Sequence, residues 1–360
     1  MDMMRGILAP GQPAPWFEAW TCHNPQFRFH TVAGKKSLLI FSGMADLSKE
    51  NTVKSISCLL TEAKSHDCTI FLITNRQTAD VLDYLIILPT NVVVFSDPDS
   101  SIHQQFGIHT DAPIVNNFIC FVLDARLTIR AVRQFGTEPH HTAAQIRPLL
   151  QALQQESAQF TIQAPVLVLP GIFEPALCRT LIQSYQQHGG ELSGFMREQQ
   201  GKTVLMQDPR HKIHRDHTLH DPKLIQLCLQ RIRLNLLPQL QRAFQFQATR
   251  IERYLVACYH SEQGGHFRPH RDNTTPGTAH RRFAVSINLN TCEYQGGDLR
   301  FPEFGQQLYK APTGGAVVFS CSLLHEATPV TQGERYVFLP FLYDEAAALV
   351  REKNAGSFKV

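Results

Sequence analysis

The sequence predicts a two-domain chain, in which an α/β domain precedes a mainly β domain with supporting helices. Three observations lead to this prediction. The 360 residues are too many for one ordinary core. Short apolar runs alternate with amphipathic helical stretches up to residue 157. From residue 251 onward the chain changes to short β runs separated by Gly and Pro, which is typical of an antiparallel sandwich or barrel.

The composition is that of a soluble globular protein, with 43% hydrophobic and 18% charged residues. The net charge of +3 is too small to indicate a nucleic-acid surface. The nine cysteines form no C-x-x-C pair and have no regular spacing, which disfavours a disulfide framework or zinc finger. Residues 1–15 lack the apolar segment of a signal peptide, and no apolar run reaches the roughly 18 residues of a membrane span. We therefore expect a cytoplasmic protein with no nucleic-acid or membrane partner.

The first domain is predicted over residues 1–158. A buried strand at 37–41, a helix at 47–64 and a second strand at 68–73 make a βαβ unit. The alternation continues with helices at 78–88, 99–106 and 142–157, and with strands at 91–95, 118–123 and 127–132. Strands separated by helices indicate a parallel or mixed sheet.

This first domain resembles the peroxiredoxin branch of the thioredoxin fold, through residues 10–17 (PGQPAPWF), the strand order and Asp-Ala-Pro at 111–113. A peroxiredoxin needs a low-pKa cysteine on the first turn of the helix after the strand. Here that turn, residues 41–47 (FSGMADL), has no cysteine. Cys22 precedes the strand, and Cys58 occupies an apolar helix position, where a core thiol is more common than a reactive one. We therefore predict a thioredoxin-like domain without peroxidase chemistry, which positions a substrate or mediates protein–protein contacts.

The second domain is predicted over residues 163–346, with its core at 250–344 and a frayed tail at 347–360. A polar stretch followed by Pro165 and Pro170 marks the boundary. A strand at 166–169 opens the domain. Two helices then follow, the first beginning near Pro175 and the second capped by Asp221.

Between these helices, residues 210–217 (RHKIHRDH) contain His214 and Asp216 in the order His-x-Asp. No strand pattern precedes them, and a polar segment is a poor rigid base for metal ligands. We predict a basic surface loop near the mouth of the active site. It either contacts an acidic or phosphate-bearing part of a substrate or is a plain solvated loop.

A second His-x-Asp pair carries the strongest chemical signal. His270 and Asp272 are followed by His325, 53 residues after Asp272, and by Arg335 ten residues later. Two imidazoles and one carboxylate on a β scaffold form the 2-His-1-carboxylate set of non-haem iron(II), which leaves positions open for oxygen and a bidentate co-substrate. In a double-stranded jelly roll the His-x-Asp pair and the distal histidine lie on facing strands, and the spacing fits that closure.

Residues 165–346 resemble the prolyl 4-hydroxylase family of 2-oxoglutarate- and iron(II)-dependent dioxygenases. The matching motifs, in order, are Ala257-Cys258-Tyr259, His270-Arg271-Asp272-Asn273, residues 286–290, residues 296–302 and residues 325–330 leading to Arg335. The resemblance implies that His270, Asp272 and His325 ligate iron(II) and that 2-oxoglutarate chelates its open face. It also implies that Arg335 binds the distal C5 carboxylate, which a guanidinium matches with two parallel donors.

Three further positions have open interpretations. Tyr259 matches a position that lines the co-substrate pocket, and a core tyrosine is the alternative. Asn288 stands where hypoxia-sensing prolyl hydroxylases have a tyrosine that helps to bind the same carboxylate. Arg281 aligns with a substrate-contacting arginine of that group, or is an ordinary edge-strand charge.

The resemblance implies a reaction that converts 2-oxoglutarate and O2 into succinate and CO2 and hydroxylates an unactivated C–H, with ascorbate as reductant. The expected substrate is a prolyl or other residue of a protein or peptide. One alternative is a small-molecule hydroxylase of the same superfamily; a nucleic-acid base is disfavoured because position 341 is Phe where the demethylase branch has a second arginine. Another alternative is a non-catalytic redox-fold scaffold, against which the intact triad argues.

Overall fold

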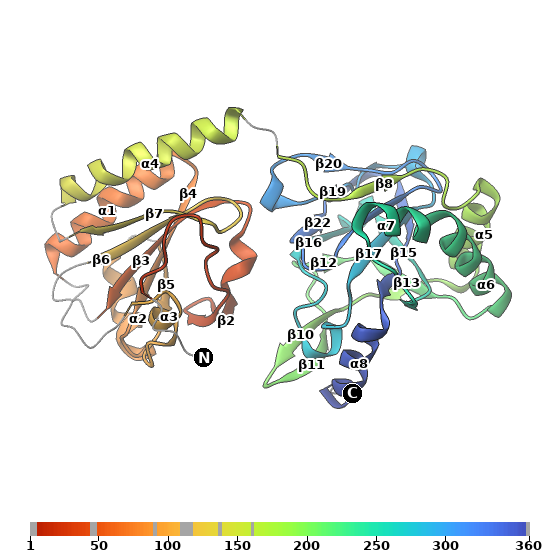
Figure 1. Ribbon diagram of the computed structural model, residues 1–360, viewed down its shortest axis with the longest axis horizontal. Coiled ribbons are helices and arrows are strands. Elements are labelled where there is room, and N and C mark those ends of the chain that lie inside the picture. Colours follow the sequence, from red (N-terminus) through yellow and green to blue (C-terminus); the bar gives the residue numbers. More distant parts are fainter. Residues whose placement is uncertain are drawn as a thin grey trace. The chain divides into compact units, whose positions relative to one another are not determined.

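The computed structural model of the protein describes residues 6–43, 49–88, 92–108, 118–135, 139–159 and 162–357 (Figure 1). The chain divides into two compact units, Met1–Ile162 with Pro302–Gly305, and Gln163–Phe301 with Gln306–Val360. Two features of the sequence comparison with peroxiredoxins, residues 44–47 of the cysteine-free turn and Asp-Ala-Pro at 111–113, lie outside the described residues. The two units are considered one at a time.

The first unit contains a seven-stranded mixed sheet with the order β2-β1-β5-β4-β3-β6-β7 among the described residues. Its central strands run parallel: β3 (Lys36–Gly43), β4 (Cys68–Thr74) and β5 (Val92–Ser96), joined by α1 (Glu50–Ser65) and α2 (Thr78–Ile87). The flanking strands are antiparallel: β6 (Phe118–Leu123), β7 (Ile129–Phe135), β1 (Glu18–Thr21) and β2 (Asn24–Arg28). The predicted α/β, thioredoxin-like fold is confirmed.

Both faces of this sheet are buried. Alternate side chains of a strand point to opposite faces, so neighbouring residues of β3 pack into different parts of the core. Leu38 and Ile40 of β3 pack in the core beneath α1 and α4 (Pro139–Gln159), which lie side by side (Figure 1). Phe41 contacts the rings of Phe106 and Phe121 in an aromatic cluster. Burial on both faces explains why the central strands are continuous apolar runs in the sequence.

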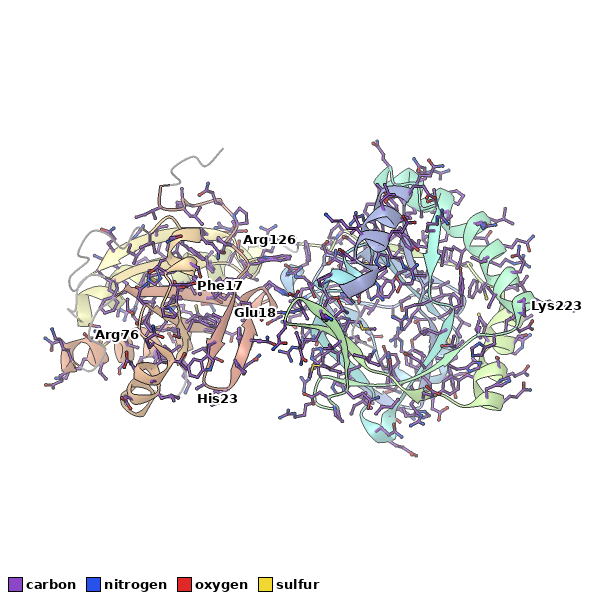
Figure 2. All side chains as sticks on the ribbon, turned by 90° about the horizontal axis from the view of Figure 1, so that it is seen from below. Phe17, Glu18, His23, Arg76, Arg126 and Lys223 are labelled. Atoms are coloured by element: carbon purple, nitrogen blue, oxygen red, sulfur yellow. The ribbon has the colours of Figure 1, made fainter. Side chains whose placement is uncertain are left out.

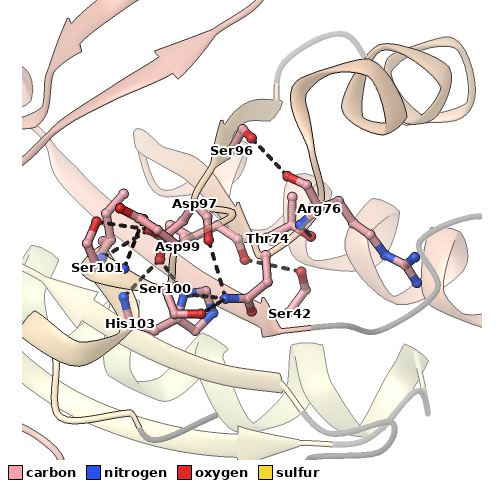
Figure 3. A network of polar contacts seen from close by, with 12 residues as sticks. Ser42, Thr74, Arg76, Ser96, Asp97, Asp99, Ser100, Ser101 and His103 are labelled. Atoms are coloured by element: carbon pink, nitrogen blue, oxygen red, sulfur yellow. Dashed lines mark hydrogen bonds and ion pairs between the residues drawn. The ribbon is translucent and has the colours of Figure 1, made fainter.

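A buried polar network occupies the ends of β4 and β5 (Figure 3). Asp97 follows β5 directly and accepts hydrogen bonds from the backbone N–H groups of Ile102 and His103, at the start of α3 (Ser101–Gln105). The Nδ1–H of His103 also donates to Asp97, at 2.6 Å. The carboxylate thereby satisfies backbone donors that the first turn of a helix leaves unpaired.

The second unit contains two facing antiparallel sheets, which form the predicted jelly roll. The smaller sheet consists of β12 (Lys212–Ile213), β16 (His266–His270), β22 (His325–Ala327), β19 (Leu299–Arg300) and β20 (Leu308–Tyr309). The larger consists of β14 (Arg250–Glu252), β25 (Phe341–Tyr343), β17 (Phe283–Asn288), β24 (Glu334–Phe338), β15 (Leu255–His260), β13 (Arg215–Thr218) and β9 (Glu191–Leu192), with β21 (Ala316–Ser320) and β8 (Leu167–Leu169) attached through β17. Two short two-stranded sheets complete the unit. One pairs β10 (Phe195–Gln199) with β11 (Lys202–Met206), and the other pairs β18 (Gln295–Gly296) with β23 (Val330–Gln332).

Helices α5 (Pro175–His188), α6 (Pro222–Arg231) and α7 (Leu237–Phe244) contribute their apolar residues to the same core as the larger sheet. The predicted cap of the second helix is present, because Asp221 accepts a hydrogen bond from the backbone N–H of Lys223. These helices cover one face of the sheet, so its other face is left for the site. Within the described residues, none of the helices has the length and hydropathy needed to cross a membrane.

Two sequence predictions in this unit are wrong. Residues 210–217 are not a surface loop, because they include strands β12 and β13, and the side chains of Lys212 and His214 are buried. The segment predicted as a frayed tail begins within helix α8 (Glu345–Lys353), which Asp344 caps through the backbone N–H of Ala347. The strands were missed because β12 has only two residues and β13 four, which leaves almost no periodic signal.

Candidate active site

His270 and His325 lie opposite each other on neighbouring strands of the smaller sheet. His270 ends β16 and His325 begins β22, and the two are paired in the strand register. The Nδ1–H of His270 donates to the carbonyl of Arg268 at 2.8 Å, and that of His325 donates to the carbonyl of Leu323 at 3.0 Å. Because Nδ1 is engaged in both rings, each Nε2 is left as the lone-pair nitrogen.

Asp272 completes this cluster from the turn after β16, where its backbone N–H donates to the carbonyl of Cys321 at 3.0 Å. Its Oδ1 lies 3.6 Å from Nε2 of His270, and its Oδ2 lies 3.4 Å from Nε2 of His325. Ligand atoms of the three residues lie within 4.8 Å of one another. The oxygen and the two nitrogens thus converge without a short hydrogen bond between them, as expected of groups arranged around a cation.

The electrostatics of the cluster favour the ligand protonation states. Burial raises the pKa of Asp272, but the neighbouring His325 and His270 more than offset it, so its pKa lies well below the usual range. Burial, with the neighbouring His270, lowers the pKa of His325 to about 4. Near neutral pH this arrangement supplies a carboxylate and a neutral imidazole, which are the forms that bind a metal.

Arg335 is buried at the start of β24, directly opposite Tyr259 of β15 in the strand register. Its Nη2 donates to Ser286 Oγ at 3.0 Å and to Asn288 Oδ1 at 3.3 Å. Its guanidinium carbon lies 5.1 Å from the centre of the Tyr259 ring. The buried Nε–H has no hydrogen-bond partner among the described residues. A buried guanidinium with an unsatisfied donor fits an incoming carboxylate.

The other residues singled out in the sequence divide into two groups. Tyr259 lines the same cavity as the cluster of His270, Asp272 and His325 and as Arg335. Asn288 stands behind Arg335, bonded to it and to the carbonyl of Ala311. Arg281 is not among the residues that line the cavity, and it forms an ion pair with Glu252 at 2.7 Å.

The structure adds Lys212, His214 and Arg253 to the cavity wall. From the sequence, Lys212 and His214 were expected in a basic surface loop near the mouth of the site, and Arg253 was not singled out. Lys212 and His214 alternate with Ile213, so they share one face of the chain where β12 pairs with β16. That alternation of basic residues at 212 and 214 was the available signal. No such sequence signal exists for Arg253. It lies between β14 and β15 with a backbone φ of +70°, which only tertiary structure reveals.

These residues enclose a cleft of about 550 Å³, part of which is open to solvent. Its apolar lining includes Phe267, Phe319 and Phe341. An apolar pocket with a few convergent polar groups is the usual form of a small-molecule site. Such walls exclude water from reactive groups at its centre.

A second group of possible metal ligands, Cys258, His260 and Glu334, lies on β15 and β24. Cys258 belongs to the core shared with the helices, so it lies on the opposite face of β15 from Tyr259. His260 Nδ1 contacts Glu334 at 2.9 Å, and its Nε2 lies 3.5 Å from the sulfur of Cys258. Both nitrogens of the ring are thus engaged within the cluster.

The model of the 2OG-Fe(II) oxygenase superfamily matches residues 254–343. Residues 254–343, a quarter of the chain, are thus similar to the 2OG-Fe(II) oxygenases. His270, Asp272, His325 and Arg335 all lie within the matched segment, and the geometry described above fits iron(II) and 2-oxoglutarate. Arg253 lies directly before it, and Lys212 and His214 lie about 40 residues before it.

The oxygenase domain is also similar to curated relatives. A PKHD-type hydroxylase of Synechococcus sp. (strain JA-2-3B'a(2-13)) is 29% identical over 125 residues, which cover 33% of this chain and 53% of that protein. A PKHD-type hydroxylase of Delftia acidovorans (strain DSM 14801 / SPH-1) is 41% identical over 83 residues, which cover 21% of this chain and 37% of that protein. The chain spans about half or less of the length of each of these two relatives.

Solved structures match each unit at low overall scores. A viral collagen prolyl hydroxylase from Paramecium Bursaria Chlorella virus-1 is 16% identical with a TM-score of 0.37, covering 49% of this chain and 94% of that chain. AhpC of Mycobacterium tuberculosis is 15% identical with a TM-score of 0.35, covering 42% of this chain and 96% of that chain. Scores of this size carry no argument about function, and the fold rests on the strand topology above.

Proposed function

We propose that the protein is a 2-oxoglutarate- and iron(II)-dependent dioxygenase that hydroxylates an unactivated C–H of a protein or peptide residue, prolyl or other. The observation that supports it most directly is the convergence of His270, Asp272 and His325 in one cleft with a buried, incompletely paired Arg335. A scaffold without catalysis would have no need to keep the buried Nε–H of Arg335 without a hydrogen-bond partner.

In this proposal His270, Asp272 and His325 hold iron(II), and Arg335 holds the C5 carboxylate of 2-oxoglutarate. The bound metal supplies activation of O2 coupled to decarboxylation of 2-oxoglutarate. Ser286 and Asn288 fix the guanidinium, since both accept hydrogen bonds from its Nη2. Tyr259 supports the same group from its ring face. Arg281 receives no direct substrate contact, because Glu252 already engages its guanidinium.

The role proposed for the chain around the metal is positioning and exclusion of water. Phe267 stacks against the His270 ring with centroids 3.4 Å apart, and Phe319 lies 4.5 Å from the His325 ring. These contacts hold both imidazoles in fixed orientations. The fixed rings keep their Nε2 atoms directed at the cleft, which a three-ligand site requires.

The test is succinate formation from 2-oxoglutarate by full-length protein loaded anaerobically with iron(II) and then exposed to O2, with ascorbate included. Wild type should show O2-dependent succinate, and His270→Ala should show none. Arg335→Ala should need about 100-fold more 2-oxoglutarate, because a charged hydrogen-bonded partner has been removed from a buried carboxylate site.

The outcomes separate the alternatives. If the protein neither binds iron nor forms succinate, the proposal is wrong and the scaffold alternative stands. If it binds iron(II) and 2-oxoglutarate but forms succinate only with added substrate, turnover is tightly coupled. Mass spectrometry of peptide and small-molecule candidates then decides between the two substrate classes through a gain of one oxygen.

A further inference from the structure

Lys212, His214 and Arg253 form a second cationic group in the cleft, separate from the surroundings of Arg335. Arg335 is anchored to β17 through Ser286 and Asn288. Lys212 is anchored elsewhere, because its Nζ donates to Ser193 Oγ at 2.8 Å and to the carbonyl of Gly194 at 2.6 Å. The cleft therefore holds two differently supported cationic groups.

Lys212 is an unusual residue to bury. It is 6% exposed and lies with its Nζ 4.7 Å from the centre of the Phe267 ring, and among the described residues no carboxylate forms an ion pair with it. Burial lowers its pKa to about 7. Isolated buried ammonium groups are costly, and they are kept where an anion completes them.

His214 is 2% exposed, and neither of its ring nitrogens has a hydrogen-bond partner among the described residues. Its ring lies edge-on to Tyr259, 4.4 Å away, on the wall of the same cleft. A neutral imidazole has one N–H to donate and one nitrogen to accept. The His214 Nε2 lies 3.5 Å from Asp216 Oδ1 without a hydrogen bond, so the ring beside Lys212 can still donate to a polar ligand.

Arg253 is the third member. Its side chain is 27% exposed and lies 5.2 Å from the centre of the Phe341 ring, and its ion pair with Asp216 is a long one, at 3.7 Å. The carboxylate of Asp216 is shared, because Ser193 also donates to it. Arg253 can therefore turn toward a better anion in the cleft at little cost.

The charges of the cleft leave room for one more anion. With Lys212 protonated, its lining carries three cations, Lys212, Arg253 and Arg335, and one carboxylate, Asp272. Iron(II) and the 2-oxoglutarate dianion cancel each other, and Asp216 offsets one cation from behind Arg253. One positive charge remains, which matches a carboxylate rather than a phosphomonoester of about −1.5 to −2.

We propose that the substrate presents a single carboxylate to Lys212, His214 and Arg253, while Arg335 holds 2-oxoglutarate. This inference rests on the proposed function. It names the substrate class as acidic: a peptide with an Asp, Glu or terminal carboxylate beside the hydroxylated carbon, or a small carboxylic acid of the same shape.

The experiment uses full-length protein with Mn(II), which does not support turnover, and saturating 2-oxoglutarate. Three probes are compared: N-acetyl-L-proline, its amide, and the amide of N-acetyl-O-phosphoserine. Paramagnetic relaxation of probe protons by Mn(II) reports binding beside the metal and ignores binding elsewhere. Wild type should bind N-acetyl-L-proline about tenfold or more tightly than its amide, as expected for a charged hydrogen-bonded contact.

The preference for the carboxylate should disappear in Lys212→Met and in Arg253→Gln and persist in Lys223→Met. Lys223 is the matched control, because it is an exposed lysine near the start of α6 (Figure 2). Mn(II) affinity and unfolding temperature are measured for every variant. Arg253→Gln provides the test if burial of Lys212 makes its variant unfold.

Each contrary result has a distinct meaning. If wild type does not bind Mn(II) and 2-oxoglutarate, the proposed function fails. If it binds both but shows no preference for the carboxylate, or binds none of the probes, only the acidic-substrate inference fails. If the phosphoserine probe binds more tightly than N-acetyl-L-proline, the cationic group recognises a phosphate and the carboxylate inference is wrong. If Lys212→Met weakens 2-oxoglutarate binding as much as Arg335→Ala, the group serves the co-substrate and the inference is wrong.

Discussion

The two units each bury an aspartate beside histidine, and they use the pair in opposite ways. In the first unit Asp97 and His103 form a closed network: their side chains bond each other at 2.6 Å, and the carboxylate also accepts two backbone N–H groups. In the second unit Asp272 stands 3.4 to 3.6 Å from two histidine nitrogens and shares no short bond with them. The carboxylate of Asp97 stabilises the fold, whereas that of Asp272 is available to a ligand.

The difference lies in where each ring directs its Nδ1–H. His103 donates it to the aspartate, so its carboxylate partner is occupied. His270 and His325 donate theirs to backbone carbonyls, so their Nε2 atoms and Asp272 stay available. Residue type alone therefore does not distinguish a structural pair from a ligand set, whereas the separation does: Asp97 bonds His103 at 2.6 Å, and Asp272 stands 3.4 to 3.6 Å from two Nε2 atoms.

The largest expected effect is on metal affinity. Asp272→Asn should weaken Mn(II) binding by about 1000-fold or more, because loss of a direct ligand must exceed the 10–100-fold effect of losing an outer partner. Asp97→Asn should leave Mn(II) affinity unchanged. Isothermal titration of both variants measures this. Equal losses in the two variants would contradict the distinction drawn between the pairs.

The stability of the first unit, unlike metal affinity, should depend on Asp97. Asp97→Asn should lower the free energy of unfolding of the first unit by about 3 kcal/mol, since it breaks a buried charged network. Urea unfolding followed by tryptophan fluorescence measures this selectively, because the two tryptophans of the chain, Trp16 and Trp20, both lie in the first unit. Asp99→Asn is the control: Asp99 is exposed and accepts a hydrogen bond from the backbone N–H of Ser101, so the loss of stability should stay below about 0.5 kcal/mol.

A third buried carboxylate, Glu252, sharpens the comparison beside the cleft. Burial raises its pKa, but hydrogen bonds and charge from His280 and Arg281 bring the pKa well below its ordinary value of 4.5. A pKa lowered by folding stabilises the fold above the unfolded pKa, and that stabilisation is lost as pH falls below about 4.5. Glu252→Gln should therefore cost about 2 kcal/mol at pH 7, with the difference from wild type shrinking toward pH 3.

Circular dichroism during urea unfolding at pH 7, 5 and 3.5 measures this dependence. A difference between wild type and Glu252→Gln that stays constant across these pH values would show that the glutamate acts through packing rather than charge. Glu345→Gln is the control on the same side of β14, because Glu345 pairs with Arg250 at the surface. Surface pairs contribute about 0 to 1 kcal/mol.

The same comparison explains which parts of the structure could be read from the sequence. The strands of the first unit were predictable because burial on both faces makes them continuous apolar runs, and His270-x-Asp272 because local spacing fixes it. Lys212 and His214 were misplaced because β12 is two residues long and exists only through its pairing with β16. A basic segment looks solvated in sequence, and only the tertiary structure shows that it lines a cleft. The left-handed backbone of Arg253 was likewise out of reach, since nothing local demands it at a residue other than glycine.

The smallest effect concerns the thiols, where the first unit is compared with the peroxiredoxins it resembles. Burial raises the pKa of Cys68 to about 12 and that of Cys120 further, so these thiols stay protonated and unreactive near neutral pH. Iodoacetamide at pH 7.5 should therefore label the exposed Cys22 and Cys292 and leave Cys68 and Cys120 unmodified, as peptide mass spectrometry would show. Full-length protein should not turn over peroxide with dithiothreitol. If it does, and Cys22→Ser or Cys58→Ser loses the activity, the first unit retains a peroxidatic thiol. The two units would then both carry chemistry, and the first would not merely support the second.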